Sequence, residues 1–271
     1  MSVAPAGAPT ATFGTRTIHH RENVMGTVVT FDLVVNEDDR RDAVYLRLAQ
    51  ARTALHRADA VFSTWRARSP ISRLRRGEIS IAECPPEVAE VLDKCAAIKS
   101  ISSGWFDPWA MPGGVDPTGY VKGWAAQRAL FILVSAGLSG AIVNAAGDLA
   151  ILGSQASGEP FRIGIVDPFA TEQLACVVEP SGSIATSGTY ERGAHLIDPH
   201  SGRTISRVAS ASVTGPDLGT ADALATALAV AGENGLAIIE GLDGYEALTI
   251  GLDGSRRCTA EFPLASVNRD D

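Results

Sequence analysis

Residues 219–230 read GTADALATALAV, and this stretch decides where the core of the protein lies. Its Ala, Leu and Val content is typical of a helix buried against other elements. Two residues break the apolar pattern: Asp222, and Thr226 four positions later. On an α-helix this spacing places the carboxylate and the hydroxyl on one face, one turn apart. Such a pair either serves the helix itself, through its dipole or a bond back to a carbonyl, or binds a hard cation such as Mg²⁺.

The composition limits the class of protein. The chain has 271 residues, of which 45% are hydrophobic and 20% charged, and this is ordinary for a soluble globular protein. The formal net charge of -8 argues against a nucleic-acid partner, because no broad basic face can form. We expect the one basic cluster, RLRRGE at 73–78, to be a solvated helix end.

Cysteine usage and the chain start indicate a cytoplasmic protein. No Cys-x-x-Cys pair occurs, so the sequence predicts neither a zinc ribbon nor a disulfide framework. The longest apolar run, 129–134, is far shorter than the ~20 residues of a membrane span, and we predict no membrane insertion. Residues 1–16 have no hydrophobic signal region. We expect them to form a flexible tail before a single domain at 17–271.

Hydrophobic periodicity predicts helices early in the chain and strands late. The predicted helices cover 38–62, 86–102, 116–137 and 219–231, with one more starting at Ser69 and Pro70. The predicted strands cover 24–35, 161–166, 174–179, 182–188, 194–198, 246–251 and 257–262, with a hairpin at 140–153 that turns near Gly147 and Asp148. This order favours an α+β fold: a compact, two-lobed domain with a mixed, largely antiparallel sheet and flanking helices.

A glycine-rich loop at 113–125, GGVDPTGYVKGWA, leads into the helix that carries Lys122. The free N–H groups of a helix start next to a lysine form a ready anion site. The alternative is a well-capped helix with a solvated Lys122. The spacing differs from that of a Walker A loop.

A second polar segment, IATSGTYERGAHLIDPHSGR, occupies 184–203. Residues 186–188 offer hydroxyls and backbone donors to a phosphate. His195 either orients or transfers a proton, or is a structural histidine. The sequence supports no Ser-His-Asp triad, because it contains no Gly-x-Ser-x-Gly.

Taken in order, seven segments resemble the ApbE-type flavin transferases, also called FAD:protein FMN transferases. The resemblance runs from Met25 to beyond Ala229. The segments are MGT at 25–27, VFSTWRARSPISRL at 61–74, GWFDP at 104–108, VDPTGYVKGWAAQR at 115–128, VNAAGDLAILG at 143–153, IATSGTY and HLIDPHSGR within 184–203, and SVTGPDLGTADALATALAV at 212–230.

The resemblance implies an enzyme that binds FAD and Mg²⁺ and transfers FMN to a Thr or Ser of an acceptor flavoprotein, releasing AMP. It implies metal ligation by Asp222, Thr226 and the backbone carbonyl of Gly119, and a catalytic role for His195. The residues that match FAD-holding positions are Met25, Trp65, Trp105, Phe106, Asp107, Asp116, Lys122 and Ile197. Without the resemblance, the apolar and aromatic members of this set would be interpreted as core residues.

The sequence departs from the family pattern at two places. Some relatives carry an extra acidic ligand where this chain has Ala225, and the family's Gly-Gly-Asp turn begins here with Ala146. Two other functions fit nearly the same residues. One is an FAD pyrophosphatase, in which water replaces the acceptor hydroxyl, and the other is a flavin-binding protein without turnover.

Overall fold

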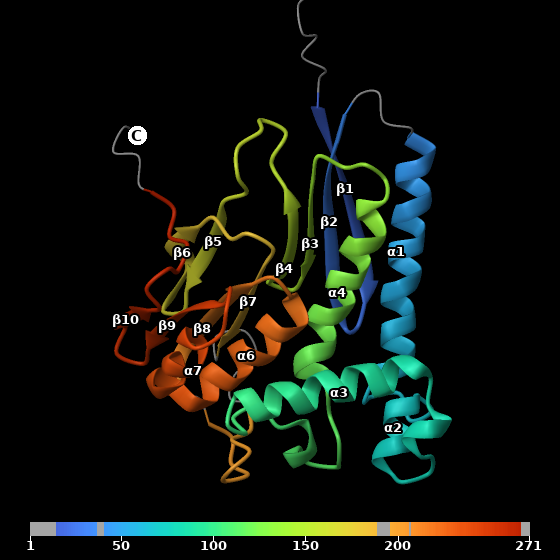
Figure 1. The fold of residues 1–271 in the computed structure, drawn as a ribbon, viewed down its shortest axis with the longest axis vertical. Helices are drawn as coiled ribbons and strands as arrows, with labels where there is room; N and C mark the ends of the chain where they lie inside the picture. The colour runs from blue at the N-terminus through green and yellow to red at the C-terminus, as the bar shows by residue number, and fades with distance from the viewer. Residues whose placement is uncertain (1–14, 37–40, 189–195, 206, 267–271) are drawn as a thin grey trace, which may run out of the picture.

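An eight-stranded sheet forms the centre of the protein (Figure 1). The computed structural model describes residues 15–36, 41–188, 196–205 and 207–266. Every strand pair described in the sheet is antiparallel. In spatial order the strands are β1 (Thr15–Val24), β2 (Thr27–Asn36), β3 (Gly140–Ala145), β4 (Asp148–Gly153), β7 (Ser183–Gly188), β8 (Val208–Gly215), β9 (Glu246–Gly251) and β10 (Arg256–Cys258). Two further strands, β5 (Ile163–Asp167) and β6 (Ala170–Val178), form a separate antiparallel ribbon.

The helices pack against this sheet and against one another. They are α1 (Arg41–Phe62), α2 (Pro70–Arg75), α3 (Pro86–Ile101), α4 (Thr118–Val134), α6 (Leu218–Ala231) and α7 (Leu236–Glu240), with short 3₁₀ turns at Ile81–Glu83, Pro108–Ala110 and Gly232–Gly235. Helix α4 contacts β3, β4, α1 and α6, and α6 contacts β7 and β8. In Figure 1, α3 crosses below the lower ends of α1 and α4. The predicted α+β class is confirmed.

The predicted helices agree with the structure within a few residues, and Ser69 caps α2 by accepting a hydrogen bond from the Ser72 N–H. The predicted strand at 24–35 is wrong at its start. Met25 and Gly26, with φ of 56° and 70°, form the turn between β1 and β2. The edge strand β1 begins at Thr15, inside the predicted tail, and its polar sequence has no apolar alternation to indicate a strand.

Strand β8 was not predicted, although all eight of its residues are buried. Its Ala- and Ser-rich sequence lacks the large β-branched residues that usually indicate a strand. The prediction of a strand at 194–198 is wrong for its described part, where Ile197 forms one isolated bridge with Thr204. Residues 194 and 195 lie outside the described residues.

Helix α6 runs through the interior, as its sequence predicted. Twelve of its residues, including Asp222, are buried. The continuous helical stretch 218–240 is long and apolar enough to cross a membrane by composition alone, but 67% of its most apolar window is buried inside the fold. Burial in the core is sufficient to explain this composition.

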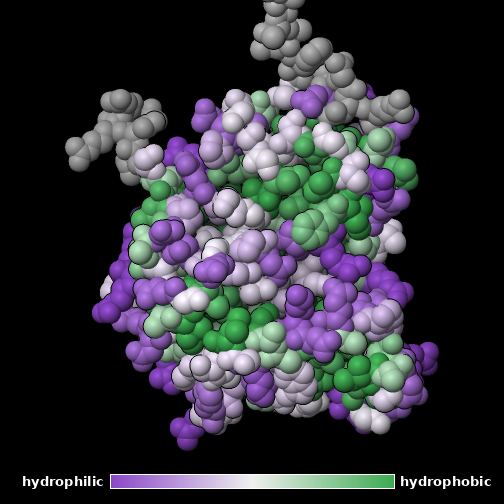
Figure 2. Space-filling model, viewed as in Figure 1, coloured by the Kyte–Doolittle hydropathy of each residue, from purple (hydrophilic) through white to green (hydrophobic). Residues whose placement is uncertain are grey.

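Exposed apolar side chains lie on α1 and on the C-terminal half of α4. They include Tyr45 and Leu46 on α1, and Phe131 and Val134 on α4. Figure 2 shows green surface over this upper part of the two helices. Residues 118–122 of α4 lie at the opposite, N-terminal end of this helix, about two and a half to four and a half turns away.

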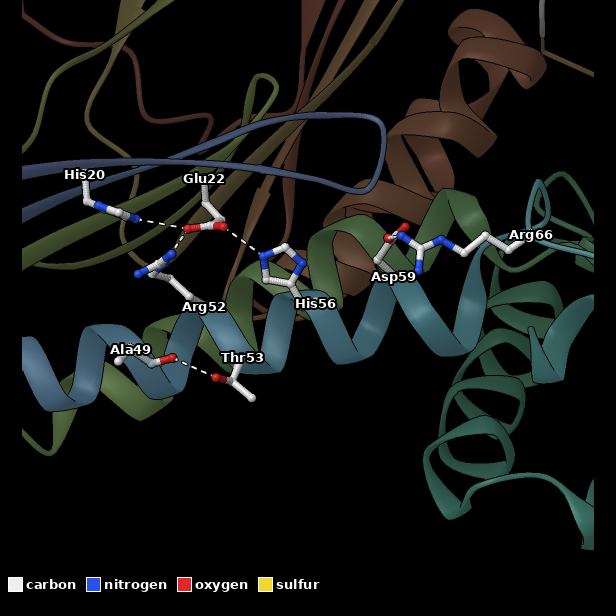
Figure 3. A network of polar contacts seen from close by, with 8 residues as sticks. All are labelled: His20, Glu22, Ala49, Arg52, Thr53, His56, Asp59 and Arg66. Atoms are coloured by element: carbon white, nitrogen blue, oxygen red, sulfur yellow. Dashed lines mark hydrogen bonds and ion pairs between the residues drawn. The ribbon is translucent and has the colours of Figure 1, made fainter. Parts of the chain in front are cut away.

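A polar network joins the β1–β2 hairpin to α1 (Figure 3). The Glu22 carboxylate accepts hydrogen bonds from His56 at 2.8 Å and from His20 at 3.1 Å, and it pairs with Arg52. The bond from His56, together with those from Arg52 and His20, lowers the pKa of Glu22 to about 2. The network fixes the hairpin next to the turn that carries Met25.

Candidate active site

Asp222 lies in the second turn of α6 and does not cap the helix. The N-cap is Asp217, whose carboxylate accepts the Thr220 N–H at 2.8 Å. Asp222 is only 4% exposed, and its Oδ2 accepts a hydrogen bond from the Gly123 N–H of α4 at 3.1 Å. The Asp222 carboxylate is therefore directed at the neighbouring helix and not at the free N–H groups that begin α6.

A glycine allows the two helices to approach this closely. A Cβ placed on Gly123 would lie 2.4 Å from the Leu218 carbonyl oxygen and 3.1 Å from the Cβ of Asp222. Any larger residue would push α4 away from α6. The close contact brings Lys122, the residue before Gly123, to the same side of α6 as Asp222.

Lys122 pairs with a carboxylate that the sequence analysis did not select. Its ammonium forms an ion pair with Asp148 Oδ2, and its side chain is 24% exposed, so Lys122 is not a solvated helix residue. Asp148 is fully buried at the first position of β4, and its Oδ1 accepts the Thr186 N–H of β7 at 3.1 Å. Asp148 was predicted only as part of a hairpin turn. The signal that could have identified it is its position as the Asp of the family's Gly-Gly-Asp turn, which reads Ala146-Gly147-Asp148 in this chain.

The two buried carboxylates face one another. Burial, followed by the charge of Asp148, raises the pKa of Asp222 well above its ordinary value, whereas Lys122 and the Gly123 N–H act in the opposite direction. Lys122 is the one cationic side chain that the described residues place in an ion pair with either of them. The two carboxylates therefore carry more negative charge than Lys122 neutralises, and this favours the binding of a further cation.

Thr226 lies one turn after Asp222 and faces β7. Its Oγ1 is 3.3 Å from Ser187 Oγ. Gly119 of α4 lies opposite, since a Cβ there would be 3.5 Å from Thr226 Oγ1 and 3.3 Å from the Phe106 ring. A side chain at position 119 would fill the space beside the hydroxyl. The structure thus brings together the three residues predicted as metal ligands.

These residues line a cavity of about 310 Å³ between the α4 and α6 starts and β7. The sequence-predicted residues that line it are Trp105, Phe106, Asp107, Asp116, Gly119, Lys122, Ile197, Asp222 and Thr226. The segment 186–188, predicted as a phosphate contact, lines it as well. His195 lies outside the described residues.

Met25 and Trp65 line a second cavity of about 560 Å³, between the β1–β2 turn and the end of α1. Trp65 is 96% exposed, so it is not a core residue. Both cavities have Thr118 and Lys122 in their walls, so they adjoin at the first turns of α4. The predicted FAD contacts therefore fall into two groups on either side of Lys122.

Asp107 and Asp116 hold the loops around the first cavity. Asp107 accepts the Trp109 N–H and pairs with Lys99 at 2.7 Å. Asp116 accepts hydrogen bonds from the N–H and hydroxyl of Thr118, and it pairs with Arg75 at 2.9 Å. Their carboxylates shape the rim through these bonds. Arg75 belongs to the basic cluster at 73–78, so one of its arginines reaches inward.

Trp105 is held in the cavity wall by two residues that the sequence analysis did not select. The His200 ring lies 4.5 Å away at 83°, and the Arg207 guanidinium lies 5.5 Å from the Trp105 ring. Arg207 in turn is 3.7 Å from Asp198. His200 follows Pro199 in the polar segment at 184–203, but its identity alone gave no signal for an aromatic partner.

The oxygen set around Asp222 suits Mg²⁺. The described residues contain no group of three or more His, Cys, Asp and Glu side chains placed to hold a metal ion, so a soft or nitrogen-rich metal site is not formed by them. The oxygen atoms available to ligate a metal are those of the Asp222 carboxylate, the Thr226 hydroxyl and the Gly119 backbone carbonyl. Asp148 Oδ2 has an ion pair with Lys122 but no well-aligned hydrogen-bond donor among the described residues. One or two carboxylates with neutral oxygens is the usual protein contribution to a Mg²⁺ site.

Comparison with known proteins identifies relatives across most of the chain. The ApbE family model matches residues 25–114 and 111–249. An FAD:protein FMN transferase of Rhodobacter capsulatus is 38% identical over 158 residues, which cover 55% of this chain and 30% of the relative. One from Vibrio cholerae is 36% identical over 138 residues, covering 46% and 41%. The matches span less than half the length of these relatives.

Solved structures have the same fold. The flavin transferase ApbE from Vibrio cholerae superposes with a TM-score of 0.79 at 22% identity, covering 93% of this chain and 98% of that one. The apo flavinyl transferase ApbE of Pseudomonas stutzeri gives 0.79 at 22%, covering 95% and 100%. The fold and the matched residues agree, and the chain belongs to the ApbE family.

Proposed function

We propose that this protein is a Mg²⁺-dependent FAD:protein FMN transferase. In this reaction an acceptor Thr or Ser hydroxyl attacks the FMN phosphorus of FAD, the pyrophosphate bond breaks, and AMP leaves. The product is FMN joined to the acceptor through a phosphoester. The observation that carries the proposal is the convergence of Asp222, Thr226, Gly119 and Lys122 on the wall of one cavity. The names of the relatives support the same activity.

The two adjoining cavities suit a dinucleotide with two ring systems. The first offers Trp105 and Phe106, and the second offers Met25 and the exposed Trp65. Aromatic side chains of this kind stack on planar rings. Lys122 lies in the walls of both, where its ammonium would contact the pyrophosphate between the rings.

Residues of this chain would position the reacting groups and stabilise the negative charge of the phosphates during the transfer. A bound Mg²⁺, held by Asp222, Thr226 and the Gly119 carbonyl, would supply neutralisation of phosphate charge. Lys122 stabilises the negative charge that develops on the leaving AMP. Ser187 holds the Thr226 hydroxyl through their 3.3 Å contact. Deprotonation of the acceptor hydroxyl by His195 remains a prediction from the sequence.

One assay tests the proposal. The protein is incubated with FAD and Mg²⁺, with and without a candidate acceptor, and AMP and protein-bound flavin fluorescence are measured after denaturation. The transferase predicts AMP only with the acceptor, together with flavin that survives denaturation. AMP without an acceptor would favour an FAD pyrophosphatase, and FAD binding without AMP would favour a flavin-binding protein.

A cytoplasmic location and a cytoplasmic flavoprotein acceptor are part of this proposal. Both come from the sequence, and cell fractionation with an antibody to the protein would test the first. Identification of the protein that gains covalent FMN in cells that express this chain would test the second.

A further inference from the structure

We propose that Asp148 is a positioning residue, whose carboxylate holds the Lys122 ammonium away from Asp222 and so keeps Asp222 available to the metal. The proposal rests on the proposed function, since it assigns a role within the same site. Asp148 lies outside the predicted ligand set, and the sequence predicted it only as part of a hairpin turn.

The position of Asp148 is fixed by its backbone. The β3–β4 hairpin turns at Ala146 and Gly147, with φ of 53° and 91°, and pairs Ala145 with Asp148. Asn144 Oδ1 accepts the Gly147 N–H at 2.8 Å and closes this turn. Positive φ at both central residues is typical of the tight turns that match the twist of a hairpin. The carboxylate therefore projects from a rigid point of the sheet.

Each oxygen of Asp148 has a different partner. Oδ1 accepts the Thr186 N–H at 3.1 Å, which ties it to β7 in the cavity wall. Oδ2 pairs with Lys122 on α4. Because the side chain is fully buried, loss of either partner would leave a desolvated carboxylate oxygen unpaired, which is costly. Asp148 thus links β7 to the lysine that both cavities share.

Helix α4 is held by two carboxylates at adjacent residues. Asp148 takes the side chain of Lys122, and Asp222 accepts the backbone N–H of Gly123. Without the Asp148 charge, Asp222 is the neighbouring carboxylate to which the ammonium would turn. An ammonium paired with Asp222 would repel Mg²⁺ from its principal ligand. The orienting carboxylate is therefore required for the metal, although it does not bind it.

Mn²⁺ binding to the FAD-free protein tests this role through a double-mutant cycle. The variants are Asp148→Asn, Lys122→Met and the double variant, with Mn²⁺ affinity measured by calorimetry and by the electron paramagnetic resonance of free Mn²⁺. Mutation of residues that surround and orient the ligands of a metal typically weakens metal binding by about 10–100-fold. We expect Asp148→Asn to weaken Mn²⁺ binding about tenfold or more. Lys122→Met should bind Mn²⁺ at least as tightly as the wild type.

The double variant gives the decisive result. If Asp148 acts through Lys122, Asp148→Asn should change the Mn²⁺ affinity by less than about threefold when it is made in the Lys122→Met background, because the two changes are coupled. A double variant as weak as Asp148→Asn would overturn the proposal, since Asp148 would then be a ligand itself or a purely structural residue.

Glu22→Gln is the matched control, because Glu22 is also a nearly buried, ion-paired carboxylate but lies in the α1 network. Its Mn²⁺ affinity should equal that of the wild type. Equal losses in Glu22→Gln and Asp148→Asn would overturn the positioning role. Urea unfolding of each variant reports whether it folds.

The cycle requires neither FAD nor an acceptor, so its result is separate from the AMP assay. A coupled cycle with no AMP release would contradict the proposed function and leave the role of Asp148 supported. A wild type that binds no Mn²⁺ would overturn the role of Asp148.

Discussion

Glu22 and Asp222 are both nearly buried carboxylates, with side-chain exposure of 11% for Glu22 and residue exposure of 4% for Asp222, but their surroundings are opposite. Glu22 is bound by Arg52, His20 and His56, and its pKa is lowered to about 2 (Figure 3). Asp222 lies against a second carboxylate, and burial together with Asp148 raises its pKa. The chain itself supplies the Arg52 charge and the hydrogen-bond donors that stabilise the ionised form of Glu22.

This difference separates a structural carboxylate from a binding one. A carboxylate that its own chain neutralises stabilises the fold, because its charged form is the favoured one. A carboxylate placed against another at a cavity wall is costly to ionise, and a bound cation relieves that cost. The comparison predicts that Glu22 affects stability and that Asp222 affects ligand binding.

The largest expected effect is on turnover in Asp222→Ala. Loss of the principal metal ligand should lower Mg²⁺-dependent AMP release by about a hundredfold or more. The free energy of unfolding of the metal-free protein should stay the same or rise, because a desolvated carboxylate is removed. Kinetics with FAD and urea unfolding measure the two. Unchanged turnover would show that the metal assignment is wrong.

The contact between α4 and α6 gives the next effect. In Gly123→Ala the new Cβ would meet the Leu218 carbonyl oxygen at 2.4 Å, and we expect a loss of about 1–3 kcal/mol in the free energy of unfolding. Gly119→Ala, on the same helix, has no contact under 3.3 Å and should change stability by less than about 1 kcal/mol. It should nevertheless slow turnover, because the Cβ lies beside Thr226. Equal stability losses in the two variants would contradict this distinction.

The Glu22 network should show the reverse pattern. Glu22→Gln removes the charge that binds Arg52, His20 and His56, and should lower the free energy of unfolding by about 1–2 kcal/mol near pH 6. The lower part of the usual range applies because Arg52 and His56 are about half exposed. AMP release should stay within about twofold of the wild type. A large loss of activity in a stable variant would place Glu22 in the site.

The smallest expected effect is the pH dependence of the difference in unfolding free energy between the wild type and Glu22→Gln. The pKa of Glu22 is about 2 in the folded protein and near 4.5 when unperturbed, so its contribution to stability is complete above about pH 4.5 and is lost as the pH falls towards 2. Denaturation of wild type and Glu22→Gln across this range should give curves that converge at low pH. A difference that persists unchanged to pH 2 would contradict the lowered pKa.

The parts of the fold with strong periodicity were predictable from sequence. The buried helix at 219–231 and its two oxygen residues could be read from their spacing, since helical geometry fixes which residues share a face. Strand β8 could not, because its Ala and Ser residues carry little intrinsic strand preference, and its burial depends on α6 and the neighbouring strands.

The site was predictable only to the extent that its residues are marked by local motifs or by the family resemblance. Asp148 follows a hairpin turn, and in sequence it resembles any other turn aspartate. Its pairing with Lys122 joins residues 26 positions apart on different elements, so only the packing of α4 on the sheet brings them together. The same holds for His200 against Trp105.

Anomalous scattering from crystals soaked with Mn²⁺ tests the central claim most directly. The account predicts one strong peak within about 2–2.4 Å of an Asp222 carboxylate oxygen and the Thr226 hydroxyl, and no peak at Glu22. A peak at the Glu22 network, or full occupancy elsewhere with none at Asp222, would contradict it.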